Sequence, residues 1–342
     1  MKRFLKKFFI VLALLSVALG LFYRQMLMYL LSQGKGQFNI ITESISIDEA
    51  LTKYQSDTLL LKKIHLLVDA KKFAAEQLHL KVENTFSTIY FPQHDTITLR
   101  VINACDALSF DEYQWKYPLI GEAPYKGFFN KERLQSEYKR LKNLGLDVDV
   151  GQVEAWSTLG IINNPMMYSV LENTEIEIAE TIIHESLHAT IFIKSNADFN
   201  ESFAEFIGEK GAEMFLKTTS SIACKQVDLS RKKKQEKLKM ILLNYAERLQ
   251  QLYVSSHSTK LKLQQKKLLI HACCQEIFNS KLLSIQRAKR FSIRLMKSGN
   301  AIFSAYRTYH SNKFDFEKEL QETYQGDLLQ MINGYKKSYS LE

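Results

Sequence analysis

The sequence predicts an α+β protein in which helix predominates over strand. Of its 342 residues, 46% are hydrophobic, which is ample for a packed core, whereas only 4 are proline and 13 are glycine. Leu, Lys, Glu and Gln dominate the second half of the chain, and these residue types favour helix. Short β-rich segments occur in the first half. We therefore expect a small β-sheet followed by a C-terminal helical hairpin.

The N-terminal segment has the charge order of a secretory signal or a signal anchor. Four basic residues within the first seven positions precede an uncharged apolar run over residues 8–23. This run would rise roughly 24 Å as a helix, short of a ~30 Å hydrocarbon core. Residues 26–31 prolong it, which favours an uncleaved anchor over residues 1–24 and places one domain, residues 25–342, on the periplasmic or extracellular side. The alternatives are a cleaved signal and a buried N-terminal helix of a cytoplasmic protein.

In the first half of the remaining chain, segments with a helical pattern alternate with β-rich segments. Apolar residues at helical spacing predict two helices within residues 43–82, and residues 88–91 and 96–101 are typical of strands. Residues 115–129 mix proline and glycine with aromatic residues, which predicts a packed irregular loop. Helix is expected again over residues 131–144, where a following glycine ends it.

The middle of the chain contains a strand and then a broken helical segment. Residues 146–158 predict a strand, and residues 163–165 predict a turn. A helical residue pattern covers residues 175–194, breaks at residues 195–198 and resumes from Asn200. We therefore expect two helices joined by a short loop.

The second half is predicted to be a long helical hairpin. Its two helices are expected over residues 231–254 and 259–292, within a hairpin that spans about 215–292. The last forty residues add one or two further helices.

The charge and cysteine content excludes some classes of partner. A net charge of +9 could indicate an anionic partner, but the basic residues do not lie beside aromatic residues or in a nucleic-acid motif, so nucleic acid is not expected. The densest basic run, residues 231–234 with Lys237 and Lys239, is interpreted as a solvated helix face, with contact to an anionic surface as the alternative. The four cysteines contain no C-x-x-C pair, which argues against a disulfide framework.

His184, Glu185 and His188 form the pattern with the most chemical content. Two histidines four residues apart lie about 40° apart on one helix face, where both imidazoles can bind one metal ion. The Glu185 carboxylate could take a proton from a water that the metal has made acidic and later deliver it to a departing amine. The alternative is two histidines that are satisfied on a largely buried helix.

A third ligand is expected from the next helix. Catalytic zinc needs three protein ligands and one open position. Glu201 follows His188 after twelve intervening residues, enough for the chain to turn and start a second helix alongside the first. Glu205 lies one turn further on, where it could accept the free ring N–H of a ligand histidine. The reverse assignment, with Glu205 as ligand and Glu201 as its support, stays open, as does the interpretation of both as surface glutamates.

The same residues carry a resemblance to known zinc peptidases. His184-Glu185-x-x-His188 followed by Asn200-Glu201-x-x-x-Glu205 resembles the thermolysin-like gluzincins. This resemblance implies a zincin-like catalytic core with Glu201 as the third zinc ligand and with Asn200 and Glu205 in supporting positions. The chain departs from the pattern by a shorter connection between the helices and by Glu rather than Asp at position 205.

Over nearly its whole length the chain is more similar to a bacterial family of zinc aminopeptidases, often attached to the membrane outside the cytoplasm. This resemblance implies one Zn²⁺ per chain and a peptide substrate. Family members often carry cysteines at the positions of Lys116 and Glu122, so we expect an ion pair here in place of a disulfide. Besides the zinc segment, the likeness rests on residues 115–118, 125–129, 145–148, 155–160 and 300–301, and on Tyr309.

The resemblance to zinc peptidases also gives roles to residues outside the zinc segment. An edge strand commonly pairs with extended substrate, and residues 153–159 are the candidate, although an ordinary half-buried strand explains them equally well. Tyr309 and His310 are candidate donors to the oxyanion of the tetrahedral intermediate, although either could be structural. The candidate substrate-binding residues are Ala155, Trp156, Ser157 and Thr158.

Three functions follow from these patterns. The first is a zinc-dependent peptidase, an aminopeptidase by resemblance. The second keeps the zinc but acts on a non-peptide substrate or a cell-wall amide. The third is a non-enzymatic, membrane-anchored protein whose 215–292 hairpin binds a partner and whose histidines are incidental or hold a structural metal. We favour the first, while the identity of any protein partner is not predicted.

Overall fold

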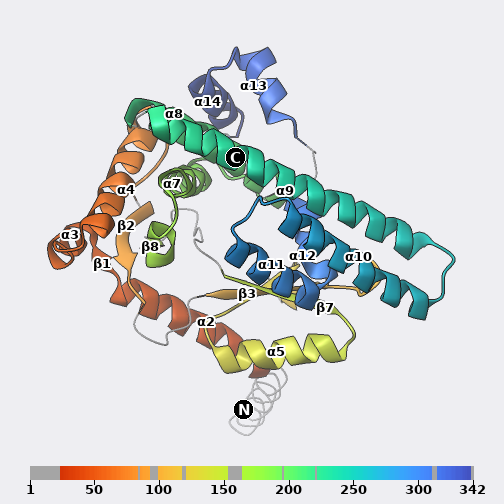
Figure 1. Cartoon of the computed structure of the whole chain (residues 1–342). Coiled ribbons are helices and arrows are strands. Elements are labelled where there is room, and N and C mark those ends of the chain that lie inside the picture. Colours follow the sequence, from red (N-terminus) through yellow and green to blue (C-terminus); the bar gives the residue numbers. More distant parts are fainter. Residues whose placement is uncertain are drawn as a thin grey trace, which may run out of the picture.

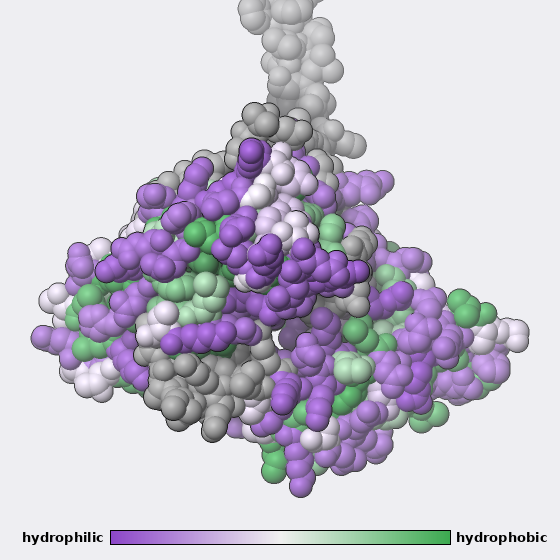
Figure 2. All heavy atoms as spheres, turned by 90° about the horizontal axis from the view of Figure 1, so that it is seen from above, coloured by the Kyte–Doolittle hydropathy of each residue, from purple (hydrophilic) through white to green (hydrophobic). Residues whose placement is uncertain are grey.

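The computed structural model confirms a predominantly helical α+β protein, whose arrangement is shown in Figure 1. Two three-stranded sheets and one two-stranded hairpin occupy the first half of the described chain, and helices form most of the rest. Seen from above, the molecule presents mainly hydrophilic side chains, with hydrophobic ones scattered between them (Figure 2). The structure describes residues 24–83, 85–92, 99–117, 121–152, 164–194, 196–219, 222–309 and 314–339.

The elements follow one another along the chain with short connections. Those of the first half are α2 (Arg24–Glu43), β1 (Ile45–Ser46), α3 (Ile47–Lys53), α4 (Thr58–Glu76), β2 (Thr85–Tyr90), β3 (Arg100–Cys105), β4 (Trp115–Tyr117), β5 (Gly121–Ala123), β6 (Tyr125–Phe128), α5 (Lys131–Asn143), β7 (Asp147–Gln152), β8 (Asn164–Met167) and α6 (Tyr168–Leu171). Those of the second half are α7 (Glu175–Thr190), α8 (Ala197–Thr219), α9 (Ile222–Val254), α10 (Thr259–Asn279), α11 (Ile285–Ser298), α12 (Asn300–Tyr309), α13 (Phe316–Tyr324) and α14 (Leu328–Tyr339).

The largest hydrophobic core lies between the first sheet and helices α4, α7 and α8. In this sheet β2 is central, antiparallel to β1 and parallel to β8, with Ile89 opposite both Ile45 and Met166. Ile64 of α4 and Ile183 of α7 are fully buried in the same cluster. The core therefore holds α7, the helix that carries both histidines, against the sheet.

The second sheet has the order β6-β3-β7, with both neighbours antiparallel to β3. Helix α5 packs against one side of it, around buried Leu141 and Val148. Helices α11 and α12 contact β7 and α12 also contacts β3 (Figure 1). This sheet thus connects the N-terminal half of the chain with the C-terminal helices.

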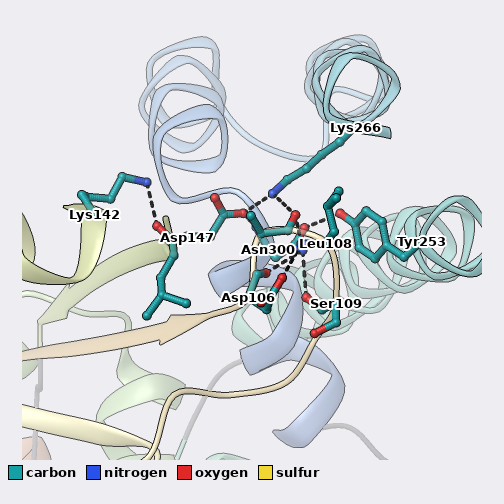
Figure 3. Close-up of polar contacts among 10 residues, drawn as sticks. Asp106, Leu108, Ser109, Lys142, Asp147, Tyr253, Lys266 and Asn300 are labelled. Carbon is teal, nitrogen blue, oxygen red and sulfur yellow. Dashed lines mark hydrogen bonds and ion pairs between the residues drawn. The ribbon is translucent and has the colours of Figure 1, made fainter. Parts of the chain in front are cut away.

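A buried polar junction, drawn in Figure 3, joins that sheet to the C-terminal helices. The Asp147 carboxylate of β7 pairs with the Lys266 ammonium of α10 and accepts a hydrogen bond from the Asn300 backbone N–H at 2.6 Å. The Asn300 Nδ2 donates to the backbone carbonyls of Asp106, Ala107 and Ser109 at 2.9–3.2 Å. Four segments of the chain, around residues 106–109, 147, 266 and 300, are held together at this junction.

The structure corrects the predicted loop and turn of the first half. Residues 115–129 are not an irregular loop, because β4 pairs with β5 and β6 pairs with β3. The pairing places Lys116 opposite Glu122, and their side chains form the predicted ion pair at 3.2 Å. The turn predicted at residues 163–165 is wrong for Asn164 and Pro165, which belong to β8, while residue 163 lies outside the described residues. Pro165 is tolerated because β8 lies at the edge of its sheet. The predicted strand over residues 146–158 is confirmed for Asp147–Gln152; Leu146 precedes the strand, and residues 153–158 lie outside the described residues.

The helical hairpin is confirmed, with different ends. Helices α9 and α10 pack against each other, and α9 begins earlier than predicted, at Ile222. The predicted helix over residues 259–292 is instead two helices, α10 and α11. Lys281 between them has φ of +54°, and the Ser284 side chain accepts a hydrogen bond from the Arg287 N–H to start α11. A backbone that enters the left-handed region cannot continue a right-handed helix.

The prediction of a single-pass membrane protein is wrong. No helix in the described part of the chain is both long enough and apolar enough to cross a bilayer. The apolar residues 26–31 belong to α2, but Ser32, Gln33 and Lys35 follow in the same helix and make it too polar. The anchor predicted over residues 1–24 lies outside the described residues except for Arg24.

Candidate metal centre

Helix α7 places both histidines by burying its other faces. Its start is fixed by Glu177, whose carboxylate accepts a hydrogen bond from the Thr174 backbone N–H at 2.8 Å. Ile183 and Leu187 are buried in the core beneath the helix. His188 is buried and His184 keeps a quarter of its side chain exposed, so the two rings face away from the sheet toward α8.

Asn200 shapes the loop that returns the chain from α7 to α8. Its side chain is buried, its Nδ2 donates to the Ile193 carbonyl at 2.8 Å, and its Oδ1 accepts from the Ile193 N–H at 2.9 Å. These two bonds close the loop and start α8 beside the end of α7. Asn200 therefore shapes the backbone of the loop between the two helices.

Two glycines let α8 approach α7 closely. A Cβ at Gly208 would lie 3.1 Å from the Glu180 carbonyl oxygen and 3.3 Å from the His184 Cβ. A Cβ at Gly211 would lie 2.9–3.1 Å from atoms of Leu78 and Ile183. This pair was not predicted from the sequence, although two glycines three residues apart on one helix indicate a close helix contact.

An aromatic cluster holds the opposite side of α8. Phe199 and Phe203 stack on each other and contact Phe316 and Tyr335, with a Phe203 to Tyr335 centroid distance of 4.4 Å. At 100° per residue, Glu201 points away from both phenylalanines. By packing on this side of α8, the C-terminal helices keep Glu201 on the opposite side, which faces α7.

His184, His188 and Glu201 converge on one point. The two histidine Nε2 atoms are 3.1 Å apart, and the Glu201 carboxylate oxygens lie 3.6 Å from the His184 Nε2 and 3.4 Å from the His188 Nε2. Tetrahedral zinc with bonds of about 2.0–2.2 Å separates its ligands by about 3.3–3.6 Å. The three side chains therefore fit a single metal ion in spacing and in donor type, as their grouping within 4.8 Å also indicates.

The charged groups of the cluster shift one another's pKa values. Burial would lower the pKa of His184, but its hydrogen bond to Glu201 and the charges of Glu185, Glu201 and Glu205 raise it. Burial would raise the pKa of Glu201, yet hydrogen bonds with both histidines hold it well below its usual range. The three glutamates therefore place negative charge around the point where a cation would bind.

Glu185 lies beside these three side chains, and its carboxylate is not fully hydrogen-bonded among the described residues. Its Oε2 is buried and has no hydrogen-bond partner among the described residues. Burial raises the pKa of this carboxyl group, while the neighbouring histidines act in the opposite direction. A buried acceptor without a partner is expensive to keep, and such groups concentrate at functional sites.

The remaining predicted site residues divide into one near the cluster and several outside the described residues. Glu205 interacts electrostatically with His184, but no hydrogen bond joins them in the described chain; burial and the charge of Glu209 raise its pKa. Tyr309 is the last residue of α12, and nothing is described of its side chain. His310 and the predicted substrate-binding residues Ala155, Trp156, Ser157 and Thr158 lie outside the described residues.

Fold and cluster together define a helical α+β protein with two histidines and a glutamate placed to hold one metal ion. The chain belongs to the family described as "Putative aminopeptidase", whose model matches residues 28–341. The predicted membership of an aminopeptidase family is thereby confirmed, and the family description indicates a peptidase that acts on peptides. No curated protein and no solved structure matches the chain.

Proposed function

We propose that this protein is a zinc-dependent aminopeptidase and that His184, His188 and Glu201 hold the zinc ion within a zincin-like core. The mutual spacing of the three donor atoms, 3.1–3.6 Å, supports this proposal most directly. A set of two imidazoles and one carboxylate is also a ligand set that catalytic zinc uses. Half of the Glu201 side chain is exposed, so solvent and substrate can approach from that side.

Within this proposal Glu185 is the general base. A zinc ion at the site would supply Lewis acidity, which lowers the pKa of water and polarises a carbonyl group. The Glu185 Oε2, which has no hydrogen-bond partner among the described residues, takes a proton from the attacking water. The raised pKa of the carboxyl group lets it keep that proton until the leaving amine nitrogen accepts it.

Glu205 has a supporting role in the proposal. It lies one helical turn beyond Glu201 and interacts electrostatically with His184. A carboxylate there stabilises the positive charge that accumulates around the histidines and the bound cation. Glu205 therefore strengthens metal binding without being a ligand.

Substitution of the general base tests the mechanism. Glu185→Gln keeps the shape of the side chain but removes its ability to accept a proton. We expect hydrolysis of peptides to fall by about 10²–10⁴-fold while the zinc content stays that of the parent protein. Glu172→Gln, at an exposed glutamate, is the matched control and should keep the parent rate.

The same assay separates the alternatives. Peptide hydrolysis by Glu185→Gln at the parent rate contradicts the mechanism. A peptide library with free and blocked N-termini tests the aminopeptidase assignment, because an aminopeptidase requires the free amine. Cleavage of blocked peptides at equal rates contradicts that assignment but leaves the zinc mechanism standing.

A further inference from the structure

A hollow lies between α9 and α10, close to the turn that joins these two helices. Its volume is about 460 Å³, which is within the range of sites that hold a small ligand. The side chains that line it from the two helices include Arg248, Gln251, Leu252, Gln265, Leu268 and Leu269. The turn lies at the end of the hairpin that is far from α7 and α8, so the hollow is separate from the candidate metal centre (Figure 1).

Three leucines give the hollow an apolar wall. Leu252 is only 7% exposed, and Leu269 packs against the core that α9 and α10 share. Leu268 borders the same hollow but keeps 70% of its surface exposed. A ligand in the hollow would remove this exposed apolar surface from water. The wall therefore favours a ligand with an apolar body.

One guanidinium group supplies positive charge at the hollow. The Arg248 Cζ lies 4.6 Å from the centroid of the Tyr245 ring, and Tyr245 is buried. This cation–π contact orients the guanidinium group on a fixed ring. Arg248 forms no ion pair with a carboxylate of the described residues. A planar guanidinium group can donate two parallel hydrogen bonds to a carboxylate, so Arg248 is suited to bind one.

The charges around the hollow select against a ligand that carries an ammonium group. Residues 248–268 contain five Lys and Arg residues and no Asp or Glu residue. The nearby Glu247 accepts a hydrogen bond from the Gln251 Nε2 at 3.4 Å, and Glu276 acts on Tyr245, but neither glutamate lines the hollow. An anion is therefore attracted, whereas a bound ammonium group would lose water without gaining a negative partner from the described lining residues.

We propose that this hollow binds an apolar monocarboxylate, with the carboxylate on Arg248 and the apolar body along Leu252, Leu268 and Leu269. Two sources share this chemistry, namely a fatty acid and the C-terminal end of a peptide that finishes in apolar residues. The amides of Gln251 and Gln265 would hydrogen-bond the peptide groups of the second. This site goes beyond the proposed function and does not depend on it.

Isothermal titration calorimetry of the whole protein with four small molecules tests the proposal. Octanoate stands for a fatty acid and N-acetyl-leucyl-leucine for the end of a peptide. Octanol lacks the carboxylate, and leucyl-leucine adds a free ammonium group. We expect at least one of the two carboxylates to bind, and octanol and leucyl-leucine to bind at least about tenfold more weakly than that carboxylate.

A matched pair of variants assigns the binding to the hollow. Arg248→Met removes the guanidinium group and should weaken carboxylate binding by at least about tenfold, because a hydrogen bond to a charged group is lost. Lys267→Met makes the same change in net charge on an exposed residue of α10 that does not line the hollow, and it should keep the parent affinity. Parent affinity in Arg248→Met, or an equal loss in Lys267→Met, overturns the proposal.

A second substitution tests the apolar wall. Leu268→Glu places a carboxylate beside the hollow at a side chain that is exposed, so the fold should tolerate it. Binding of the carboxylate should be lost, and parent affinity in this variant contradicts the proposal even if Arg248→Met fails to fold. Thermal unfolding of each variant shows whether it is folded.

The pattern of binding identifies the source of the ligand. Binding of octanoate alone assigns the hollow to a fatty acid, and binding of N-acetyl-leucyl-leucine alone assigns it to a peptide end. No binding of either at about 1 mM, or octanol bound as tightly as octanoate, overturns the proposal. A dimer of the parent that Leu268→Glu dissociates, with no carboxylate bound, would instead assign the hollow to contact between two copies of the chain.

Discussion

Two polar clusters of this protein differ in how fully their polar groups are hydrogen-bonded or ion-paired. At the junction of Asp147, Lys266 and Asn300, the carboxylate meets an ammonium and a backbone N–H, and the Asn300 amide is fully bonded (Figure 3). The Tyr253 hydroxyl donates to the Asn300 Oδ1 at 2.6 Å and completes the set. At the candidate metal centre, by contrast, the Glu185 Oε2 is buried with no hydrogen-bond partner in the part of the chain that the structure describes, and three donor atoms lie within 4.8 Å of one another.

On the proposed function, the difference separates a structural cluster from a metal-binding one. A buried polar network is stable when every member has a partner inside the protein, as the junction does. A cluster in which a buried acceptor lacks a hydrogen-bond partner and charged groups lie close together lowers the stability of the fold unless it binds a ligand. The junction therefore contributes to stability, whereas the proposed metal centre would give up stability for binding.

The largest expected effect on stability comes from breaking the junction. Lys266→Met removes the ammonium group and leaves the buried Asp147 carboxylate with the Asn300 N–H as its partner among the described residues. Both side chains are at least 85% buried, so we expect the free energy of unfolding to fall by about 3–5 kcal/mol. Urea denaturation of the parent and the variant measures the change.

A compensating variant identifies the cause of that loss. Lys266→Met/Asp147→Asn removes the unpaired charge as well, and should recover part of the stability. A single variant that loses less than about 1 kcal/mol would show that the pair is no stronger than an exposed one.

A smaller effect is expected from closing the gap between α7 and α8. Gly208→Ala forces a Cβ to within 3.1 Å of the Glu180 carbonyl oxygen, so α8 must move away from His184. We expect a loss of about 1–3 kcal/mol of stability together with weaker zinc binding. Thermal unfolding and zinc titration measure the two effects.

Gly34→Ala is the matched control for this substitution. Gly34 also lies in a helix, but nothing is within 4 Å of its added Cβ. Alanine there should stabilise the protein by up to about 1 kcal/mol through helix propensity. Unchanged zinc binding in Gly208→Ala would contradict the role of the close helix contact.

The smallest effect is a pH dependence of stability at a third polar cluster. Burial would raise the pKa of Glu137, but hydrogen bonds from Arg140 and Trp115 outweigh it and lower the pKa below the ordinary 4.5. A lowered folded-state pKa contributes stability above the ordinary pKa, and this contribution is lost as the pH falls through the folded-state value. The difference in unfolding free energy between the parent and Glu137→Gln should therefore be largest near neutral pH and shrink on acidification. A difference that grows on acidification would contradict this account.

The sequence predicted what depends on local spacing. The fold class, the helices that carry the cluster and the convergence of His184, His188 and Glu201 all follow from residues within one helix or one short loop. The Lys116 to Glu122 ion pair was predictable for the same reason, because few residues separate the two.

The sequence could not predict what depends on distant pairing. Contacts of Phe203 with Tyr335 and of Asp147 with Lys266 join residues more than a hundred positions apart, and no local pattern specifies such partners. The strand at Asn164–Met167 was missed because turn-forming residues mark its start, and only its pairing with β2 makes it a strand. The break between α10 and α11 was missed because Lys281 and Ser284 are weaker signals than glycine or proline.

The central claim, that His184, His188 and Glu201 bind one metal ion, is tested most directly by the zinc content of the purified protein. After dialysis against metal-free buffer, we predict roughly one zinc ion per chain. His188→Ala and Glu201→Ala should each lose most of this zinc, whereas Glu172→Gln, at an exposed glutamate, should keep it. A parent protein without bound zinc, or zinc that both ligand variants retain, would contradict the account.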